Sequence, residues 1–193
     1  MDQEMFMFYR NSLCKNLCRE YSDEWKGLLE DKVALFHFCL KQQAQPYFAT
    51  SVYQGWGLTI DFLKKGYADF INGKYIASDC DDIKGFTYGL WCGHDTPVRL
   101  TIDVPHFMGC NSIVRVPKTK CPTIYVSNKS ELDIKLGGYS SIRIYLFDES
   151  KVNISQVEDC NTVIVYKYSK DCSVTVSDNY TGKIKQFDKE LRL

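Results

Sequence analysis

At 193 residues, with 24 basic and 24 acidic side chains, the chain has a formal net charge of zero. This balance produces no strong positive field, which argues against nucleic acid as the main partner. The chain is long enough to bury a substantial apolar core, and no apolar run approaches the roughly 18 residues of a membrane-spanning helix. We therefore expect no membrane partner, and either one ordinary core or one core with a helical appendage.

The nine cysteines are odd in number and spread from Cys14 to Cys172 without a compact disulfide framework. This distribution is typical of free, buried thiols in a reducing compartment. The opening residues Met1–Glu4 carry acid where a secretory signal would carry Lys or Arg. We expect a protein made in a cytosol and stabilised without disulfides.

The first third of the chain is predicted to be helical, because its apolar residues recur at steps of three and four. Ser22 can cap the second helix and Thr59 the fourth, Pro46 suits the first turn of the third, and Asn72 with the following glycine ends the fourth. These elements form a helical region over residues 1–73. The expected helices cover residues 3–20, 23–43, 46–53 and 59–72.

Beyond residue 73 the helical period disappears, and short strands are expected. Residues 74–78 and 85–92 are predicted to be two such strands, joined by the polar turn Asp79–Asp82. Residues 74–97 would then be a hairpin or connector between the helical region and the rest of the chain.

From about Val98 onward, apolar residues separated by one position recur in pairs about every ten residues. Polar turn residues fill the intervals, and no proline follows Pro122. Residues 98–193 are therefore predicted to be a ladder of short strands. The pairs are Val114/Val116, Ile124/Val126, Ile134/Leu136, Ile142/Ile144, Val152/Ile154, Val163/Val165 and Val174/Val176, and Ile184 opens a weaker copy.

Two folds give this spacing: an antiparallel sandwich, or a solenoid in which two strands make one coil of about 20 residues. The outward residues favour the solenoid, because aromatic residues occur on every second strand and Arg115, Lys135, Asn153 and Thr175 lie on the strands between. The expected class is α+β, with about four N-terminal helices followed by a β-solenoid-like ladder. The aromatic residues are Tyr125, Tyr145, Phe147, Tyr166, Tyr168 and Phe187.

This aromatic stripe is too large to stay exposed without a reason. Either the N-terminal helical region of the same chain covers it, or another protein does. We take its residues as the candidate interaction residues. The expected partners are proteins, including further copies of this chain in a homo-oligomer.

Few residues suit catalysis. His37 lies inside a predicted helix, and His106 follows Pro105 in a predicted loop. The segment Cys92–Asp95 combines a thiol, an imidazole and a carboxylate, but residues two apart on a strand are not how a Cys–His dyad is usually built. We expect no catalytic residue and no enzyme.

Metal and cofactor motifs are also incomplete. Cys14 and Cys18 lie one helical turn apart but lack a second pair for zinc, and the turn Asp79–Asp82 lacks the glycine and distal glutamate of an EF-hand loop. The remaining grouped thiols precede strand pairs, where small buried side chains fill solenoid corners. They are Cys110, Cys121, Cys160 and Cys172. No metal or cofactor is expected.

The ladder segments Thr162–Tyr168 and Cys172–Val176 resemble those of small β-repeat proteins of Bacteroidales phages and prophages, which combine a helical N-terminal region with a β-repeat tail. The resemblance covers roughly residues 10–180. It implies a virion-associated component of a crAss-like or related tailed phage, made in the bacterial host cytoplasm and built into the particle, with no catalytic residues.

Three functions follow as hypotheses. The first is a non-enzymatic structural or assembly protein of a tailed phage particle, such as a tail, head–tail or fibre-adaptor component. The second is an intracellular binding module that sequesters a host or defence factor. The third is an enzyme using Cys92, His94 or the turn Asp79–Asp82.

Overall fold

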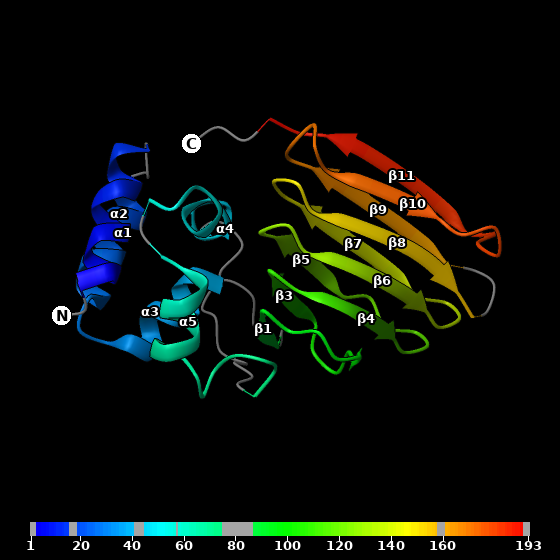
Figure 1. Cartoon of the computed structure of the whole chain (residues 1–193), viewed down its shortest axis with the longest axis horizontal. Helices are drawn as coiled ribbons and strands as arrows, with labels where there is room; N and C mark the ends of the chain where they lie inside the picture. Colours follow the sequence, from blue (N-terminus) through cyan, green and yellow to red (C-terminus); the bar gives the residue numbers. More distant parts are fainter. Residues whose placement is uncertain are drawn as a thin grey trace. The chain divides into compact units, whose positions relative to one another are not determined.

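The computed structural model describes residues 3–15, 19–40, 45–56, 58–74, 87–157 and 161–190. The chain divides into two compact units, a helical unit within Met1–Ala68 and a β unit within Asp69–Glu190. The order of elements, helices first and strands after, is visible along the ribbon in Figure 1.

The helical unit contains five helices among the described residues, where about four are predicted. Aromatic rings join three of them: Phe8 lies 4.4 Å from Trp25, and Trp25 lies 5.2 Å from Phe38, between ring centroids. All three side chains are buried, so this cluster forms the core of the unit. The helices are α1 (Gln3–Cys14), α2 (Arg19–Leu28), α3 (Lys32–Leu40), α4 (Gln45–Gln54) and α5 (Ile60–Gly66).

The predicted helix over residues 23–43 is wrong in its continuity, because Asp31 divides it into α2 and α3. The Asp31 carboxylate accepts hydrogen bonds from the backbone amides of Val33 and Ala34, at 3.1 and 2.9 Å. This is the geometry of an N-cap, which favours a new helix start over continuation of the preceding one. The predicted cap at Thr59 is confirmed, since its hydroxyl accepts from the Phe62 amide at 3.0 Å.

The β unit is a solenoid built from two parallel sheets. Sheet A has the strand order β1-β3-β5-β7-β9-β11 and sheet B the order β10-β8-β6-β4-β2. Sheet A consists of β1 (Tyr88–Cys92), β3 (Val104–Met108), β5 (Thr123–Ser127), β7 (Ser141–Leu146), β9 (Thr162–Lys167) and β11 (Lys183–Asp188). Sheet B consists of β2 (Val98–Arg99), β4 (Asn111–Val116), β6 (Glu131–Leu136), β8 (Lys151–Gln156) and β10 (Ser173–Val176).

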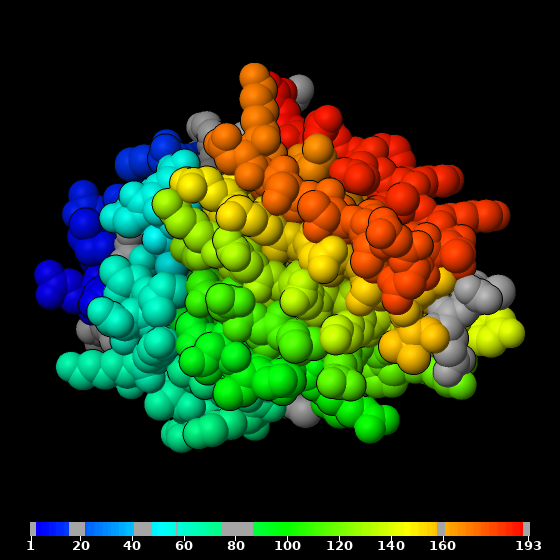
Figure 2. Space-filling view, turned by 45° about the vertical axis from the view of Figure 1, so that its right-hand side comes forward, coloured from blue at the N-terminus to red at the C-terminus, as the bar shows by residue number. Residues whose placement is uncertain are grey.

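Successive coils stack in register. Val114 pairs with Ile134, which pairs with Ile154 in sheet B, and Ile144 pairs with both Ile124 and Val165 in sheet A. The coils therefore follow one another as bands from green to red in the ribbon and in the space-filling view (Figures 1 and 2). The solenoid prediction is confirmed, and the antiparallel sandwich is excluded.

The core of the solenoid lies between the two sheets. Its buried members include the predicted inward pairs from β4 to β9, and Val174 and Ile184 pack against it from the last coil. Because side chains alternate between the two faces of a strand, the residues between these pairs lie on the outer faces. Interior strands of sheet B accordingly show the burial alternation of a one-sided sheet.

The solenoid begins earlier than predicted, at β1. The strand Tyr88–Cys92, which falls within the predicted strand 85–92, pairs in parallel with β3. The other predicted strand of the hairpin and the turn Asp79–Asp82 lie outside the described residues, apart from Lys74, which lies in a turn.

Polar side chains close the corners between strands. The Ser130 hydroxyl donates to the Ser127 carbonyl at 2.6 Å and accepts from the Cys110 amide at 3.0 Å, and the Ser130 amide in turn donates to the Ser150 hydroxyl one coil later. At the opposite corner, the Ser140 amide donates to the Asn161 side chain at 3.1 Å. These bonds satisfy corner backbone groups that no strand partner reaches.

Candidate interaction face

The predicted aromatic residues form two columns on the outer face of sheet A. We call this surface the aromatic face. The first column runs through Tyr125, Tyr145, Tyr166 and Phe187, one residue from each of four successive strands of the sheet. The second consists of Phe147 and Tyr168, which directly follow β7 and β9. The structure thus brings all six predicted interaction residues together.

The parallel register forces the rings of the first column to stack. Ring centroids lie 4.7 Å apart for Tyr125 and Tyr145, 5.0 Å for Tyr145 and Tyr166, and 5.5 Å for Tyr166 and Phe187. The interplanar angles are 9°, 26° and 21°, so the rings are nearly parallel. These separations follow from the strand spacing of about 4.8 Å in a sheet.

The second column repeats this geometry and is joined diagonally to the first. Phe147 and Tyr168 lie 4.9 Å apart at 12°, and Tyr145 lies 6.3 Å from Tyr168. Each stacked pair contributes roughly 0.5–1.5 kcal/mol beyond its buried area. Because neighbours cover both flat faces of Tyr145 and Tyr166, these rings direct their edges outward. At these two positions a partner therefore meets ring edges and phenol groups.

Exposure increases along the aromatic face towards β11. Tyr125 is 2 % exposed and Phe147 3 %, Tyr145, Tyr166 and Tyr168 are half-buried, and Phe187 is 43 % exposed. Burial raises the pKa of Tyr168, and the neighbouring tyrosines raise it further. The accessible part of the face consequently lies over β7, β9 and β11.

His106 extends the first column on the buried side, a position that the sequence analysis missed. It lies in β3 and not in a loop, pairs in register with Tyr125, and its ring centroid is 5.9 Å from that of Tyr125. Its Nε2 lies 3.2 Å from the Ser127 hydroxyl. Burial lowers the pKa of His106 to about 3, so the ring is neutral near pH 7.

Pro105 explains the error. Proline cannot donate a backbone hydrogen bond, which argued for a loop. Pairing between β3 and β5 begins at His106, one residue after the proline, so this ladder does not need the missing donor. Counting back one coil of about 20 residues from Tyr125 reaches Pro105, one residue before His106, and would have indicated a strand here.

The outer face of sheet B is polar and internally paired. The Lys151 ammonium lies 2.7 Å from the Glu131 carboxylate, and Asn153 joins Asp133 at 3.1 Å to Thr175 at 3.0 Å. The predicted polar residues Arg115, Lys135, Asn153 and Thr175 all lie on this sheet, which confirms the alternation between the two faces.

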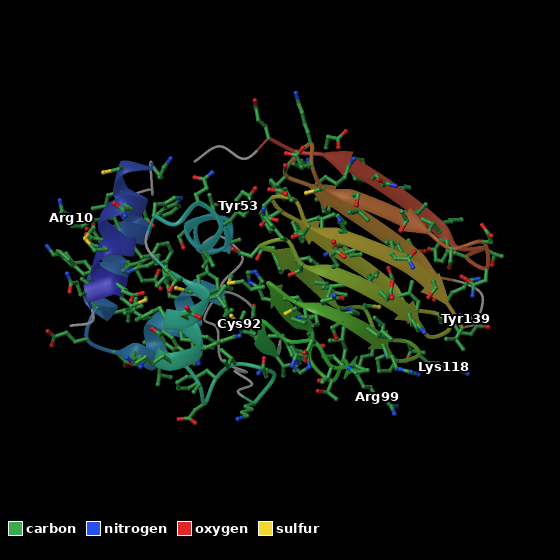
Figure 3. All side chains as sticks on the ribbon, viewed as in Figure 1. Arg10, Tyr53, Cys92, Arg99, Lys118 and Tyr139 are labelled. Atoms are coloured by element: carbon green, nitrogen blue, oxygen red, sulfur yellow. The ribbon has the colours of Figure 1, made fainter. Side chains whose placement is uncertain are left out.

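Two of the candidate catalytic residues, His94 and Cys92, lie among the described residues. The imidazole Nε2 of His94 lies 2.9 Å from the Thr96 hydroxyl, while Cys92 is buried at the end of β1, where Figure 3 labels it. His37 lies half-buried in α3.

The corner thiols divide into two kinds. Cys110 and Cys172 are buried at corners as predicted, and burial raises the pKa of Cys172 to about 11, which keeps it protonated. Cys121 is exposed, so the prediction of a buried corner thiol is wrong at this position. Cys14, at the end of α1, is exposed as well. Cys18 and Cys160 lie outside the described residues. Within the described part of the chain, no group of three or more His, Cys, Asp or Glu side chains is arranged to hold a metal ion.

Tyr139 is a highly exposed aromatic residue outside the predicted set. It is 69 % exposed at the corner between β6 and β7, and its backbone φ angle is 58°, a value that residues other than glycine rarely adopt. Figure 3 shows Tyr139 on the same side of the solenoid as Lys118, which lies in the turn between β4 and β5. The flanking Gly137-Gly138 and Ser140 were a turn signal but carried no information on exposure.

None of the described helices is long and apolar enough to cross a membrane. Comparison with protein-family models, with curated proteins and with solved structures finds no match to this chain.

Proposed function

We propose that this chain is a non-enzymatic structural or assembly protein that contacts other proteins through the aromatic face of sheet A. The observation that carries this proposal is the continuous stack from Tyr125 to Phe187, which becomes accessible towards β11. Aromatic residues are the side chains most enriched at the centres of protein interfaces.

The scaffold suits such a role because it holds the contact residues rigidly. Backbone hydrogen bonds fix β7 and β9 on both sides within the sheet, and stacking fixes the rings of Tyr145 and Tyr166. These rings are therefore already ordered before a partner binds, which lowers the entropic cost of association.

The resemblance to phage β-repeat proteins extends the proposal to a setting. In a tailed phage particle, the solenoid would serve as a rigid spacer, and repeated copies or other virion proteins would cover the aromatic face. The partner would then be found in assembled particles.

A photo-crosslinking amino acid placed at Tyr166 tests the proposed contact, with the same group at Thr175 on sheet B as the matched control. Crosslinks from position 166 to one identified protein, this chain or another, are expected in cells that assemble the complex. They should disappear when Phe187→Ala is added. Equal crosslinks from both positions, or none from 166, would contradict the proposal.

The virion setting has its own test. Mass spectrometry of purified particles should detect the chain, and sedimentation of the isolated protein should show association at high concentration. Absence from particles together with a monomer at every concentration would overturn the structural role in a virion.

A further inference from the structure

The accessible part of the aromatic face has a one-sided charge pattern. The outward positions of β7, β9 and β11, with the residue that follows each strand, contain basic residues and no acidic residue. The basic residues are Arg143, Lys183, Lys185 and Lys189, and all four are exposed. They surround Tyr145, Tyr166 and Phe187 in the register of the sheet.

These cations have no carboxylate partner among the described residues, in contrast to the charges on sheet B. On sheet B, Glu131 neutralises Lys151 within the same face. At the edge of sheet A, Asp188 pairs with Lys167 at 2.9 Å, while Lys189 places its ammonium 5.6 Å from the centroid of the Tyr166 ring. The positive charge around the column is therefore available to an external partner.

We propose that the aromatic face binds an acidic protein segment, one that carries apolar or aromatic side chains between its carboxylates; this inference rests on the proposed function. Carboxylates of the segment pair with Arg143 and Lys185, and its apolar side chains pack on the ring edges of Tyr145 and Tyr166. Opposite charges across an interface accelerate association and select the partner.

The geometry disfavours two other occupants. Single-stranded nucleic acid also binds basic, aromatic surfaces, but its bases stack on ring faces, and the faces of Tyr145 and Tyr166 are already covered. A second copy that docks by two-fold symmetry presents the same cations, so Arg143 and Lys185 would meet like charges.

Fluorescence anisotropy with the full chain tests this inference, using three labelled probes. They are a random copolymer of glutamate and tyrosine, poly-glutamate, and oligothymidylate. The copolymer should bind most tightly, because it supplies both carboxylates and rings, and added salt should weaken its binding. Tighter binding of oligothymidylate, or no binding of the copolymer at low salt, would overturn the inference.

Charge reversal locates the site. Lys185→Glu should weaken copolymer binding at least about tenfold, whereas Lys135→Glu, the same change on sheet B, should alter it less than about twofold. Both side chains lie on outer faces and form no ion pair with another described residue, so the variants should fold, which circular dichroism checks. Equal losses in both variants would show that only net charge matters and would refute the inference.

The two proposals fail separately. Crosslinks from position 166 without copolymer binding would leave the protein contact in place and remove its acidic partner. Failure of the crosslinks would remove the proposed contact itself.

Discussion

Replacing His106 by phenylalanine should make the protein less sensitive to acid. His106 is buried in β3, its Nε2 contacts the Ser127 hydroxyl, and its ring lies at the end of the stacked column. Phenylalanine keeps a ring beside Tyr125 but cannot be protonated. Ser127 retains a partner, because the Asn128 side-chain amide donates to its hydroxyl at 3.1 Å.

The direction of the effect follows from the lowered pKa. The histidine pKa is about 3 in the folded protein against 6.5 for the ordinary value, so between these pH values the unfolded chain binds the additional proton. The free energy of unfolding therefore rises with pH in this window. The contribution of His106 to that free energy is lost as the pH falls from 6.5 towards 3. At pH 5, about 1.5 pH units below the unfolded pKa, the loss is about 2 kcal/mol.

Urea unfolding at pH 7 and pH 5 measures this loss. We expect the wild type to lose about 2 kcal/mol more than His106→Phe between the two pH values. His94→Gln is the matched control, because His94 contacts Thr96 outside the column, and it should behave as the wild type does. Burial raises the pKa of Asp148, which favours the folded state as the pH falls, but this contribution is common to all three proteins and cancels. Equal losses in the wild type and His106→Phe would refute the reasoning.

Three further changes test the fold by thermal or urea unfolding. Asp31→Ala should cost about 1 kcal/mol, because the α3 amides lose their cap; an unchanged midpoint would contradict the assignment. Ile144→Ala should cost about 2–5 kcal/mol by opening a cavity between the sheets, and a cost below 1 kcal/mol would argue against a packed core there. Gly137→Ala should cost about 1–3 kcal/mol, since its new Cβ would lie 2.7 Å from the backbone nitrogen of Lys118, whereas Gly27→Ala in α2 meets open space and should be neutral or stabilising.

The solenoid could be predicted from the sequence because two different sets of residues carry its two periods, that of the strands and that of the two sheets. The inward pairs from Val114/Val116 onward give the strands, and the alternation of outward residues gives the two sheets. An antiparallel sandwich of the same strands has no reason to place aromatic residues on every second strand. The register that stacks Tyr145 between Tyr125 and Tyr166 follows from coils of nearly constant length.

The first coils could not be predicted in the same way. β1 and β3 contain Gly89 and Pro105, and neither shows a pair of β-branched residues one position apart. They form strands because the following coils provide a sheet edge on which they can pair. This tertiary pairing overrides the low β propensity of their residues. The break at Asp31 could not be predicted from the pattern either. The apolar residues around it continue the helical period, and this period gives no sign of the side-chain hydrogen bonds by which Asp31 caps α3.

The stacking of the rings also determines what the aromatic face can recognise. Sugars, bases and cations bind an aromatic ring by lying over its flat face. In this solenoid, neighbouring rings stacked at the strand spacing already cover both faces of Tyr145 and Tyr166. At these two rings, only the edges, the phenol groups and the surrounding cations remain for a ligand. An acidic, apolar protein segment meets all three kinds of group at once. The regular coil length that makes the fold predictable also stacks these rings. This stacking disfavours ligands that bind flat ring faces and favours a protein segment as the proposed partner.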